Sequence, residues 1–586
     1  MAPKLPWWKD AVGYQVWPAS FKDSNDDGWG DIPGIISKLD HIKDLGVDFI
    51  WLSPMFDSPQ YDMGYDMSNY EDIYSKFGTL EDVETLITEV HARGMRLLLD
   101  LVVNHTSHEH AWFRESKQSL TNDKADWYIW RPPKYINGQR HPPNNWRSHF
   151  WGSAWEYSPE RDQYYFHLFL PQQPDMNWEN PATREAIYES AIRFWLAKGI
   201  DGFRVDVANL YCKDQSFPDA AIVDPSAELQ PMDPKYYANG SRMHEWLREQ
   251  RQQALDPFGP DIVLIGELAE TSTAEILAYT SSRHRELDMV FDFEFKCSGG
   301  PDKELVPNPA PTDFGPPVLS EVKAAFAKTQ GFLDDEVSDS WTTVFMENHD
   351  FPRAVSRFGD DSPALWACSA KMLALFSCTL SGTLFMYQGQ EIGMTSLPVE
   401  FSIDEMRDVA SIAYVRDALA TRPGDEEWRK KVMRAVRDLG RDNARTPMQW
   451  SAGVNAGFSD IEPWIKPNPN FREINVASQK GVDGSVLEFW RQLVRLRKSS
   501  EWKGAFVHGK FELLDPSNER TFTFFKTDKQ TGKKVLVALN FSGVKQSVGV
   551  LESVRLDGLE VLISNIDACN GKTELRPWEG KVYVLD

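Results

Sequence analysis

Near position 204 the chain places a guanidinium and a carboxylate two residues apart, at the end of an apolar run. The segment reads Asp-Gly-Phe-Arg-Val-Asp over residues 201–206. If the run is a strand, Arg204 and Asp206 share one face, because side chains alternate along a strand. The Arg204 charge would then lower the pKa of Asp206 and keep it ionised, as a carboxylate nucleophile requires. A purely structural ion pair would show the same spacing, so other residues are needed to distinguish a catalytic pair from a structural one.

Further polar residues follow other strand-like runs. They are Asn104-His105, Glu267, and the run Glu347-Asn348-His349-Asp350. In a parallel barrel the carboxyl ends of the strands meet at one mouth, which would bring three carboxylates and two histidines together. Each alone has a structural explanation, but their joint placement favours a site. Carboxylates without the Cys/His spacing of a zinc site suit glycosidic bond cleavage, in which one attacks the anomeric carbon and another protonates the leaving oxygen.

Strand-like and helix-like segments alternate through most of the chain. The predicted strands are 14–21, 49–54, 96–104, 202–206, 262–267, 289–295, 342–348 and 383–388. One crossover helix begins at a capping box formed by Thr79 and Asp82 and stops at Gly94. Another begins at Asn180 and ends at Gly199. Eight strands with helical crossovers predict a (β/α)8 TIM barrel.

Two segments interrupt this alternation, which predicts three domains. Residues 105–177, rich in Trp, Pro, Asn and His, are expected to form a subdomain inserted after strand 3. Residues 1–104 and 178–508 would form the catalytic barrel, with a charged helical elaboration over 402–440. Short alternating runs over 509–586 predict a C-terminal antiparallel β-sandwich domain.

Composition limits the class of protein. The 586 residues suffice for two or three domains, and 41% hydrophobic residues support a substantial core. A net charge of −24 argues against nucleic acid as a partner. The start of the chain lacks the apolar region of a secretory signal, and the most apolar stretch, 372–387, is short and interrupted, so no membrane partner is expected. Five scattered cysteines predict reduced thiols and a cytoplasmic protein, as a monomer or weak homo-oligomer.

The motifs together resemble the α-amylase superfamily, glycoside hydrolase family 13, over nearly the whole chain. The matching segments are 100–105 (DLVVNH), 202–206 (GFRVD), 265–267 (IGE) and 347–350 (ENHD), in the family's order. The resemblance implies that Asp206 is the nucleophile that forms a β-glucosyl-enzyme. It implies that Glu267 is the general acid and then the base, so that the anomeric configuration is retained. Asp350 would bind sugar hydroxyls and stabilise the transition state, and His105 and His349 would hydrogen-bond the same glucose.

Narrower motifs resemble the oligo-1,6-glucosidase and α-glucosidase subfamily. They are 173–177 (QPDMN, with Met for the usual Leu), 62–65 (DMGY) and 441–450 (RDNARTPMQW). The resemblance implies that Asp62 and Arg441 pair and close the pocket after one glucose, while Tyr65 stacks against its ring. Phe150 and Phe169 match aromatic positions near the bound sugar, although core packing would also explain them. A closed pocket implies release of single glucoses from the non-reducing ends of oligosaccharides or disaccharides.

The residue after the expected nucleophile bears on linkage. It is Val207, where maltose-specific relatives tend to carry Thr or Ala. Val resembles the relatives that accept α-1,6 bonds, and we hypothesise α-1,6 activity, with α-1,4 activity beside it. Phe351 follows the last carboxylate where relatives often have Gln, which leaves the acceptor side of the pocket open.

A loop near the start of the chain has the composition of a metal site. Residues 23–31 read DSNDDGWGD, with oxygen donors at alternate positions around a glycine turn. It is not an EF-hand, because Gly34 stands where the bidentate Glu would be. The resemblance implies a structural Ca2+ or Mg2+ held by Asp23, Asn25, Asp27, Asp31 and the Trp29 carbonyl. A polar turn without metal is the alternative.

Three alternatives remain open at this point. Sucrose isomerases share the catalytic residues but carry an Arg-rich RLDRD loop, where this chain has RFGDD over 357–361. A phosphate-specific trehalose hydrolase would need a phosphate-binding cluster that the sequence does not display. Non-catalytic relatives, such as the heavy chains of amino-acid transporters, have lost the carboxylates that remain here.

Overall fold

The computed structural model describes residues 5–300, 310–333, 338–398, 402–547, 559–566 and 574–585. Its centre is an eight-stranded parallel sheet in the order β15-β14-β12-β5-β2-β1-β17-β16. The strands are β1 (Val12–Val16), β2 (Phe49–Leu52), β5 (Arg96–Leu101), β12 (Gly202–Val205), β14 (Val263–Leu268), β15 (Met289–Asp292), β16 (Thr343–Val344) and β17 (Thr383–Tyr387). The eight strands confirm the predicted barrel, and the strand expected over 342–348 shortens to two residues.

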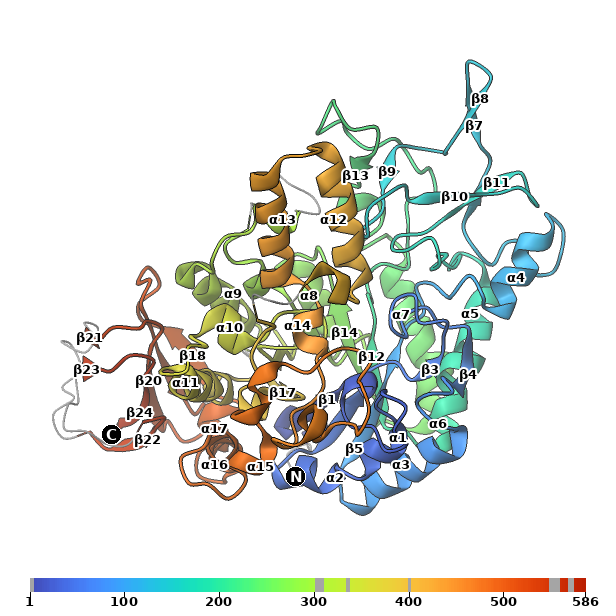
Figure 1. Cartoon of the computed structure of the whole chain (residues 1–586). Coiled ribbons are helices and arrows are strands. Elements are labelled where there is room, and N and C mark those ends of the chain that lie inside the picture. Colours follow the sequence, from blue (N-terminus) through green and yellow to red (C-terminus); the bar gives the residue numbers. More distant parts are fainter. Residues whose placement is uncertain are drawn as a thin grey trace.

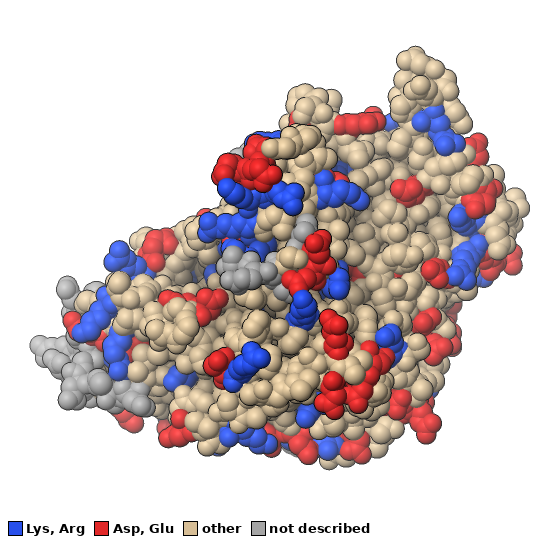
Figure 2. All heavy atoms as spheres, viewed as in Figure 1, with Lys and Arg blue, Asp and Glu red and all other residues tan. Residues whose placement is uncertain are grey.

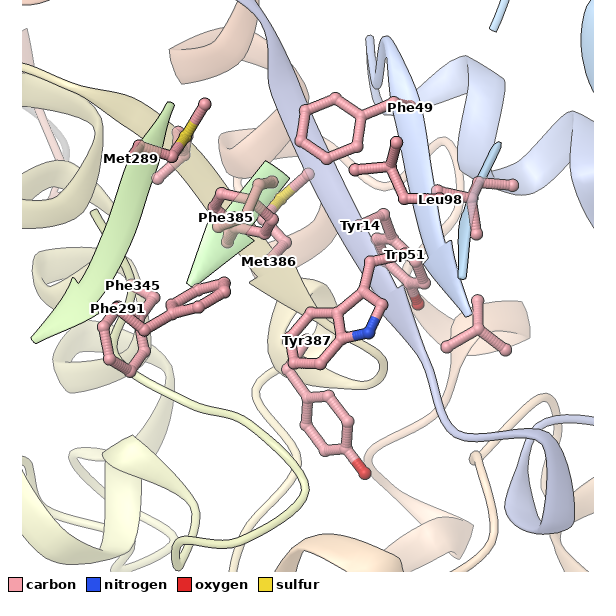
Figure 3. Packing of buried hydrophobic residues seen from close by; sticks show 14 of the residues in the cluster. Tyr14, Phe49, Trp51, Leu98, Met289, Phe291, Phe345, Phe385, Met386 and Tyr387 are labelled. Atoms are coloured by element: carbon pink, nitrogen blue, oxygen red, sulfur yellow. The ribbon is translucent and has the colours of Figure 1, made fainter. Parts of the chain in front are cut away.

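The barrel closes between β15 and β16 without a strand ladder in the described residues. There the hydroxyl of Thr343 donates to the carbonyl of Val290 at 2.9 Å. Large side chains from several strands fill the interior, as Figure 3 shows. The ring of Phe291 lies 4.8 Å from Phe385 and 5.1 Å from Phe345, centroid to centroid. The interior is therefore packed solid, and space for a ligand lies at the mouth.

Helices surround the sheet, with the strands inside them (Figure 1). They include α1 (Ile32–Ile36), α2 (Leu39–Asp44), α3 (Leu80–Ala92), α5 (Pro181–Ile187), α6 (Phe194–Lys198), α7 (Met243–Gln250), α8 (Thr273–Thr280), α9 (Leu319–Gly331), α10 (Ala354–Phe358), α11 (Trp366–Thr379) and α16 (Val486–Lys498). The capping box of Thr79 and Asp82 begins α3 as predicted. The helix expected from Asn180 to Gly199 is present, but a π-helical turn over 188–193 separates α5 from α6.

The segment after β5 forms a small unit beside the barrel mouth. Its antiparallel sheet contains β6 (Trp130–Arg131), β10 (Trp155–Ser158) and β11 (Gln163–Phe166). A hairpin of β7 (Lys134–Ile136) and β8 (Gln139–His141) projects from it (Figure 1). Its buried core also includes Val207, Phe217 and Met232 from the connection after β12. This second excursion was not predicted, and it fixes the inserted unit to the strand that ends at Asp206.

A helical hairpin, α12 (Val409–Thr421) and α13 (Glu426–Leu439), stands beside the inserted unit (Figure 1). The ring of Trp151 lies 5.0 Å from the ring of Tyr414 on α12, which joins the two across the mouth. The short helix α14 (Asp442–Arg445) follows and returns the chain to the barrel. Figure 2 shows acidic and basic side chains interspersed over this side of the molecule.

The C-terminal unit is antiparallel, as predicted. It contains a sheet in the order β18-β19-β20-β24-β22, from β18 (Lys510–Leu513), β19 (Thr521–Thr527), β20 (Lys534–Asn540), β24 (Gly580–Leu585) and β22 (Val561–Ser564). A ribbon of β21 (Gln546–Ser547) and β23 (Glu574–Leu575) accompanies it. Phe376 of α11 packs 5.1 Å from Phe522, so the unit shares the apolar core of the barrel. Among the described helices, none is both long and apolar enough to cross a membrane.

Candidate active site

Arg204 lies at the centre of the carboxylates at the barrel mouth. It is on β12 and buried, and Asp206 follows directly after this strand. Its Nη1 donates to Asp206 Oδ1 at 2.7 Å and to Asp100 Oδ1 at 2.8 Å. Its Nη2 donates to Glu267 Oε2. One guanidinium thus holds three carboxyl groups from β5, β12 and β14, as charge-assisted hydrogen bonds allow. The predicted pair of Arg204 and Asp206 is present.

Burial changes the expected electrostatics of Asp206. Burial raises the pKa of Asp206 above its ordinary value, and the Arg204 charge opposes this without cancelling it. The Arg204 charge does lower this pKa, as the sequence predicted, but the prediction left out the loss of water, which outweighs the charge. The same burial raises the pKa of Asp100 to about 6. Arg204 is what limits the rise, so it has a direct part in keeping Asp206 ionised.

A chain of hydrogen bonds extends from Asp100 to His349. The Tyr65 hydroxyl lies 3.0 Å from Asp100 Oδ2 and 2.7 Å from His349 Nε2. On the other side of the imidazole, the Gln15 amide is 2.8 Å from Nδ1. Burial lowers the pKa of His349 far below its ordinary value, so the ring is neutral. A donor at Nδ1 places the ring proton on Nε2, and His349 then donates to Tyr65, which donates to Asp100.

Asp350 follows β16 and faces two arginines. Arg445 Nη2 donates to Asp350 Oδ1 at 2.8 Å, and Arg441 Nη1 lies 3.6 Å from the same oxygen. Burial alone would raise the pKa of Asp350, but the positive charges of Arg441 and Arg445 outweigh it and lower that pKa below the ordinary value. Asp350 is therefore an ionised group at neutral pH, suited to bind hydroxyls.

Asp62 and Arg441 form the ion pair that the resemblance implied. Arg441 Nη2 donates to Asp62 Oδ1 at 2.9 Å, and Gln173 donates to Asp62 Oδ2 at 3.1 Å. Arg441 Nε also donates to Asp408 Oδ1 at 2.8 Å. Asp408 is the N-cap of α12 and almost fully buried. The helical hairpin thus fixes the position of Arg441, and its role in closing the pocket stays a prediction.

Aromatic residues and His105 border the same end. The Arg441 guanidinium lies 5.0 Å from the centre of the Phe150 ring, and that ring is 5.4 Å from Phe169. Phe169 in turn lies 5.3 Å from His105. Burial lowers the pKa of His105, so it is neutral. Phe150 and Phe169 are both partly exposed, and Phe169 also packs against the core of the inserted unit, so core packing explains part of its position. Tyr65 stacks on His349 at 5.2 Å between centroids, so its predicted contact with the sugar ring remains a prediction.

Val207 adopts an unusual backbone conformation directly after Asp206. Its φ is +38°, in a region that β-branched residues rarely occupy. Its backbone N–H donates to Glu267 Oε2 at 3.3 Å, which links the residue after the expected nucleophile to the expected acid. Strain of this kind persists only where the surroundings impose it, and it is common at active sites.

The loop over 23–31 is held by its own backbone. Asp23 accepts from the amides of Asn25, Asp26 and Gly28, and Asp31 accepts from Ser24 and caps α1 through Gly34. Burial and the nearby Asp23 charge raise the pKa of Asp31, which is a cost that a cation would relieve. In the described part of the chain, however, no three His, Cys, Asp or Glu side chains are placed closely enough to hold a metal. The donor chemistry fits a hard cation, while the side-chain positions would need to change.

Several residues of this site had no predicted role. Asp100 and Arg445 lie within the recognised motifs, but only their contacts with Arg204 and Asp350 reveal what they do. Gln15 and Asp408 lie outside the motifs and meet the site through long-range packing. The sequence signal that could have indicated them is a polar residue near the end of β1, for Gln15, and near the start of the predicted helical elaboration, for Asp408.

Taken together, the arrangement suits displacement at a sugar carbon. Asp206 accepts from one terminal nitrogen of Arg204 and Glu267 from the other. This arrangement fits the separation of about 5 Å found between the two carboxyl groups of retaining glycosidases. Inverting enzymes instead leave room for a water molecule between them. The barrel and this carboxylate group define a glycoside hydrolase.

The chain belongs to the α-amylase family, whose catalytic domain matches residues 15–504. It is 47% identical to an α-glucosidase of Candida albicans, over 99% of each chain. It is 42% identical to an oligo-1,6-glucosidase of Saccharomyces cerevisiae, over 99% of this chain and 98% of that one. Among solved structures it is similar to a mutant of the trehalose-6-phosphate hydrolase of Bacillus licheniformis, at 38% identity, and to a mutant trehalulose synthase, at 36%. Each of these two similarities has a TM-score of 0.87 and covers 99% of this chain and 100% of the other.

Proposed function

We propose that this protein is a retaining, exo-acting α-glucosidase that releases glucose from the non-reducing ends of short α-glucosides. The observation that carries the proposal is the shared guanidinium of Arg204, which holds Asp206 and Glu267 at one mouth. The pair of Asp62 and Arg441 supports a pocket for a single glucose. The family and the names of the relatives agree with this activity.

In the proposed reaction, a carboxylate oxygen of Asp206 attacks the anomeric carbon. The bond to the leaving oxygen breaks, and Glu267 donates its proton to that oxygen. Glu267 then takes a proton from water, whose oxygen displaces Asp206 and regenerates the enzyme. Two inversions give net retention. Asp350, ionised by its arginines, would stabilise the positive charge that develops on the sugar ring.

Product stereochemistry tests the mechanism directly. Proton NMR of a fresh reaction should show α-glucose first, with β-glucose appearing only by mutarotation. D206A should lower the hydrolysis of p-nitrophenyl α-glucoside by at least about 10⁴-fold while leaving the melting temperature within a few degrees. Initial β-glucose, or a fully active D206A, would refute the proposal.

We also propose α-1,6 activity, with α-1,4 activity and some transglucosylation beside it. Val207 and the oligo-1,6-glucosidase relatives favour this linkage. A panel of isomaltose, maltose and sucrose, compared by kcat/KM, tests it. Brisk maltose hydrolysis without isomaltose hydrolysis would refute the α-1,6 part, and an isomeric disaccharide formed from sucrose would favour the isomerase alternative.

For the loop over 23–31 we propose a structural Ca2+ or Mg2+ bound by Asp23, Asn25, Asp27, Asp31 and the Trp29 carbonyl. The buried charges of Asp23 and Asp31 support it, since a cation would relieve their repulsion. Chelation should lower the melting temperature, and Ca2+ should restore it. A melting temperature that is insensitive to both would refute the site.

Finally, we propose a cytoplasmic protein that is a monomer or a weak homo-oligomer. The four described cysteines Cys212, Cys297, Cys368 and Cys378 are free thiols, which favours a reducing compartment; Cys569 lies outside the described residues. Cell fractionation tests the location, and sedimentation velocity at two concentrations tests the oligomeric state. Recovery with secreted proteins would refute the cytoplasmic location. A stable oligomer at low concentration would refute the proposed oligomeric state.

A further inference from the structure

Lys296 is a buried amine whose hydrogen-bonding groups have no partner. It lies in the 3-10 turn Glu294–Cys297, directly after β15, and is 8% exposed. Its Nζ is shielded from solvent and makes no hydrogen bond. The nitrogen instead lies 3.8 Å from the centre of the Phe351 ring. A buried amine without hydrogen bonds is costly, because its donors lose water and gain nothing in return.

The Lys296 side chain lines a cavity that also reaches Asp350, one of the three expected catalytic carboxylates. The cavity has a volume of about 190 Å³, and its lining includes Lys296, Asp350, Phe351, Phe314 and Phe358. At about 30 Å³ for each water, it has room for roughly six water molecules, which is on the order of one hexose. Three phenylalanines, two prolines and a leucine make its walls largely apolar, so a ligand there would need one apolar face.

This cavity adjoins a second one that extends to the glucose end of the site. The second cavity, of about 340 Å³, is lined by Phe150 and Arg441, and it shares Pro311 and Leu439 with the first. The two cavities are therefore neighbours, with Pro311 and Leu439 bordering both. The neighbouring cation of the lining, Arg357, already donates to the carbonyls of Gly315 and Ser298. Arg357 thus already uses two of its five N–H donors, whereas the Lys296 amine makes no hydrogen bond.

We propose that Lys296 is a specificity-determining residue that hydrogen-bonds a hydroxyl of the leaving sugar, while Phe351 packs against the apolar face of that sugar. The inference rests on the proposed α-glucosidase function and names the second sugar of a disaccharide as the group that the cavity takes. A sugar supplies both requirements of the site, a hydroxyl for the amine and a face of C–H groups for the aromatic ring. An aryl leaving group can pack against the aromatic ring but has no sugar hydroxyl for the amine.

The test compares two leaving groups in a variant without the amine. K296M keeps the length of the side chain and removes its donors. We expect kcat/KM for the preferred disaccharide to fall about tenfold, and kcat/KM for p-nitrophenyl α-glucoside, whose leaving group has no sugar hydroxyls, to stay within twofold. F351L should also lower kcat/KM for the disaccharide. K328M is the matched control, because Lys328 ion-pairs with Asp292 at the end of the same strand and does not line the cavity.

The outcomes separate this inference from the proposed function. Equal losses on both substrates, or no loss on either, would overturn the role of Lys296 while leaving the α-glucosidase intact. A wild-type protein inactive on both would instead remove the proposed function. If K296M folds poorly, K296L, which also lacks donors, and the partition of the glucosyl-enzyme between water and added glucose give the same decision. We expect the fraction transferred to glucose to fall in the variant, and an unchanged fraction would overturn the proposal.

Discussion

Arg204 Nη1 donates to Asp206 Oδ1 at 2.7 Å, within a site where burial raises the pKa of the carboxyl group. Removing the positive charge should raise that pKa further, because the charge is what opposes burial. Asp206 must be ionised to attack, so R204Q should move the acid limb of the kcat/KM profile to higher pH, by about one unit or more. Activity at the optimum should fall at least about 100-fold.

The measurement is a pH profile of kcat/KM on p-nitrophenyl α-glucoside. R204K, which retains a charge but not the fork that holds three carboxyl groups, should shift the limb less than R204Q. An acid limb at the same pH in all three proteins would show that Arg204 does not control the ionisation of the nucleophile.

The pair of Asp62 and Arg441 should control binding of the terminal glucose. D62N removes the charge from a nearly buried pair that also accepts from Gln173. We expect kcat/KM for short substrates to fall about 30-fold or more, mainly through KM, since the contact is made before as well as during reaction. D57N, which alters a carboxylate on β3 (Phe56–Asp57), is the control. A D62N protein with unchanged KM would contradict the assignment.

Val207 should influence linkage preference. We expect V207T to lower the ratio of kcat/KM for isomaltose to that for maltose by about tenfold, as small changes of shape in a pocket allow. V207A should act in the same direction and also relieve part of the strain at φ +38°. Rates on p-nitrophenyl α-glucoside report whether the pocket itself remains intact. A ratio unchanged in both variants would remove Val207 from the explanation of specificity.

Asp10 should stabilise the protein at neutral pH but not in acid. Hydrogen bonds with His508 and Lys503 lower its pKa to about 2, against the burial that would raise it. Because this folded-state pKa is below the ordinary value of 3.8, the contribution is present above about pH 4 and disappears between about pH 4 and pH 2. The side chain is 35% exposed, so D10N should cost only about 0.5 kcal/mol at pH 7.

Melting temperatures of wild type and D10N at several pH values check this expectation. The difference between the two should narrow as the pH falls toward 3. D40N, which breaks an exposed pair with Arg93, serves for comparison. A difference that widens in acid would contradict the sign derived from the pKa.

The fold was largely predictable because its signals are local. The capping box of Thr79 and Asp82 and the left-handed Gly199 mark helix ends through residues close in sequence. The π-helical turn over 188–193 and the short β16 depend on packing against distant elements, and no local pattern announces them. The same holds for the connection after β12, whose apolar residues complete the core of the inserted unit.

For the site, residue types at strand ends predicted the carboxylates, because parallel strands bring these ends together. They did not predict the pKa of Asp206, which depends on how completely surrounding atoms exclude water. Nor did they reveal Asp408 or Lys296, whose places are set by a helical hairpin and by an aromatic wall. Long-range packing is what the sequence alone leaves undetermined.

The closure of the barrel at β15 and β16 has a consequence for substrate range. In the described residues a side-chain hydroxyl, rather than a run of backbone hydrogen bonds, joins the consecutive strands β15 and β16 there. Lys296 follows β15 and Asp350 follows β16. Asp206 instead follows β12 and Glu267 lies on β14, and each of these strands pairs with a neighbouring strand on both sides. Substitutions that widen the gap between β15 and β16 can therefore enlarge the space for the leaving sugar, while the distance between Asp206 and Glu267 stays the same.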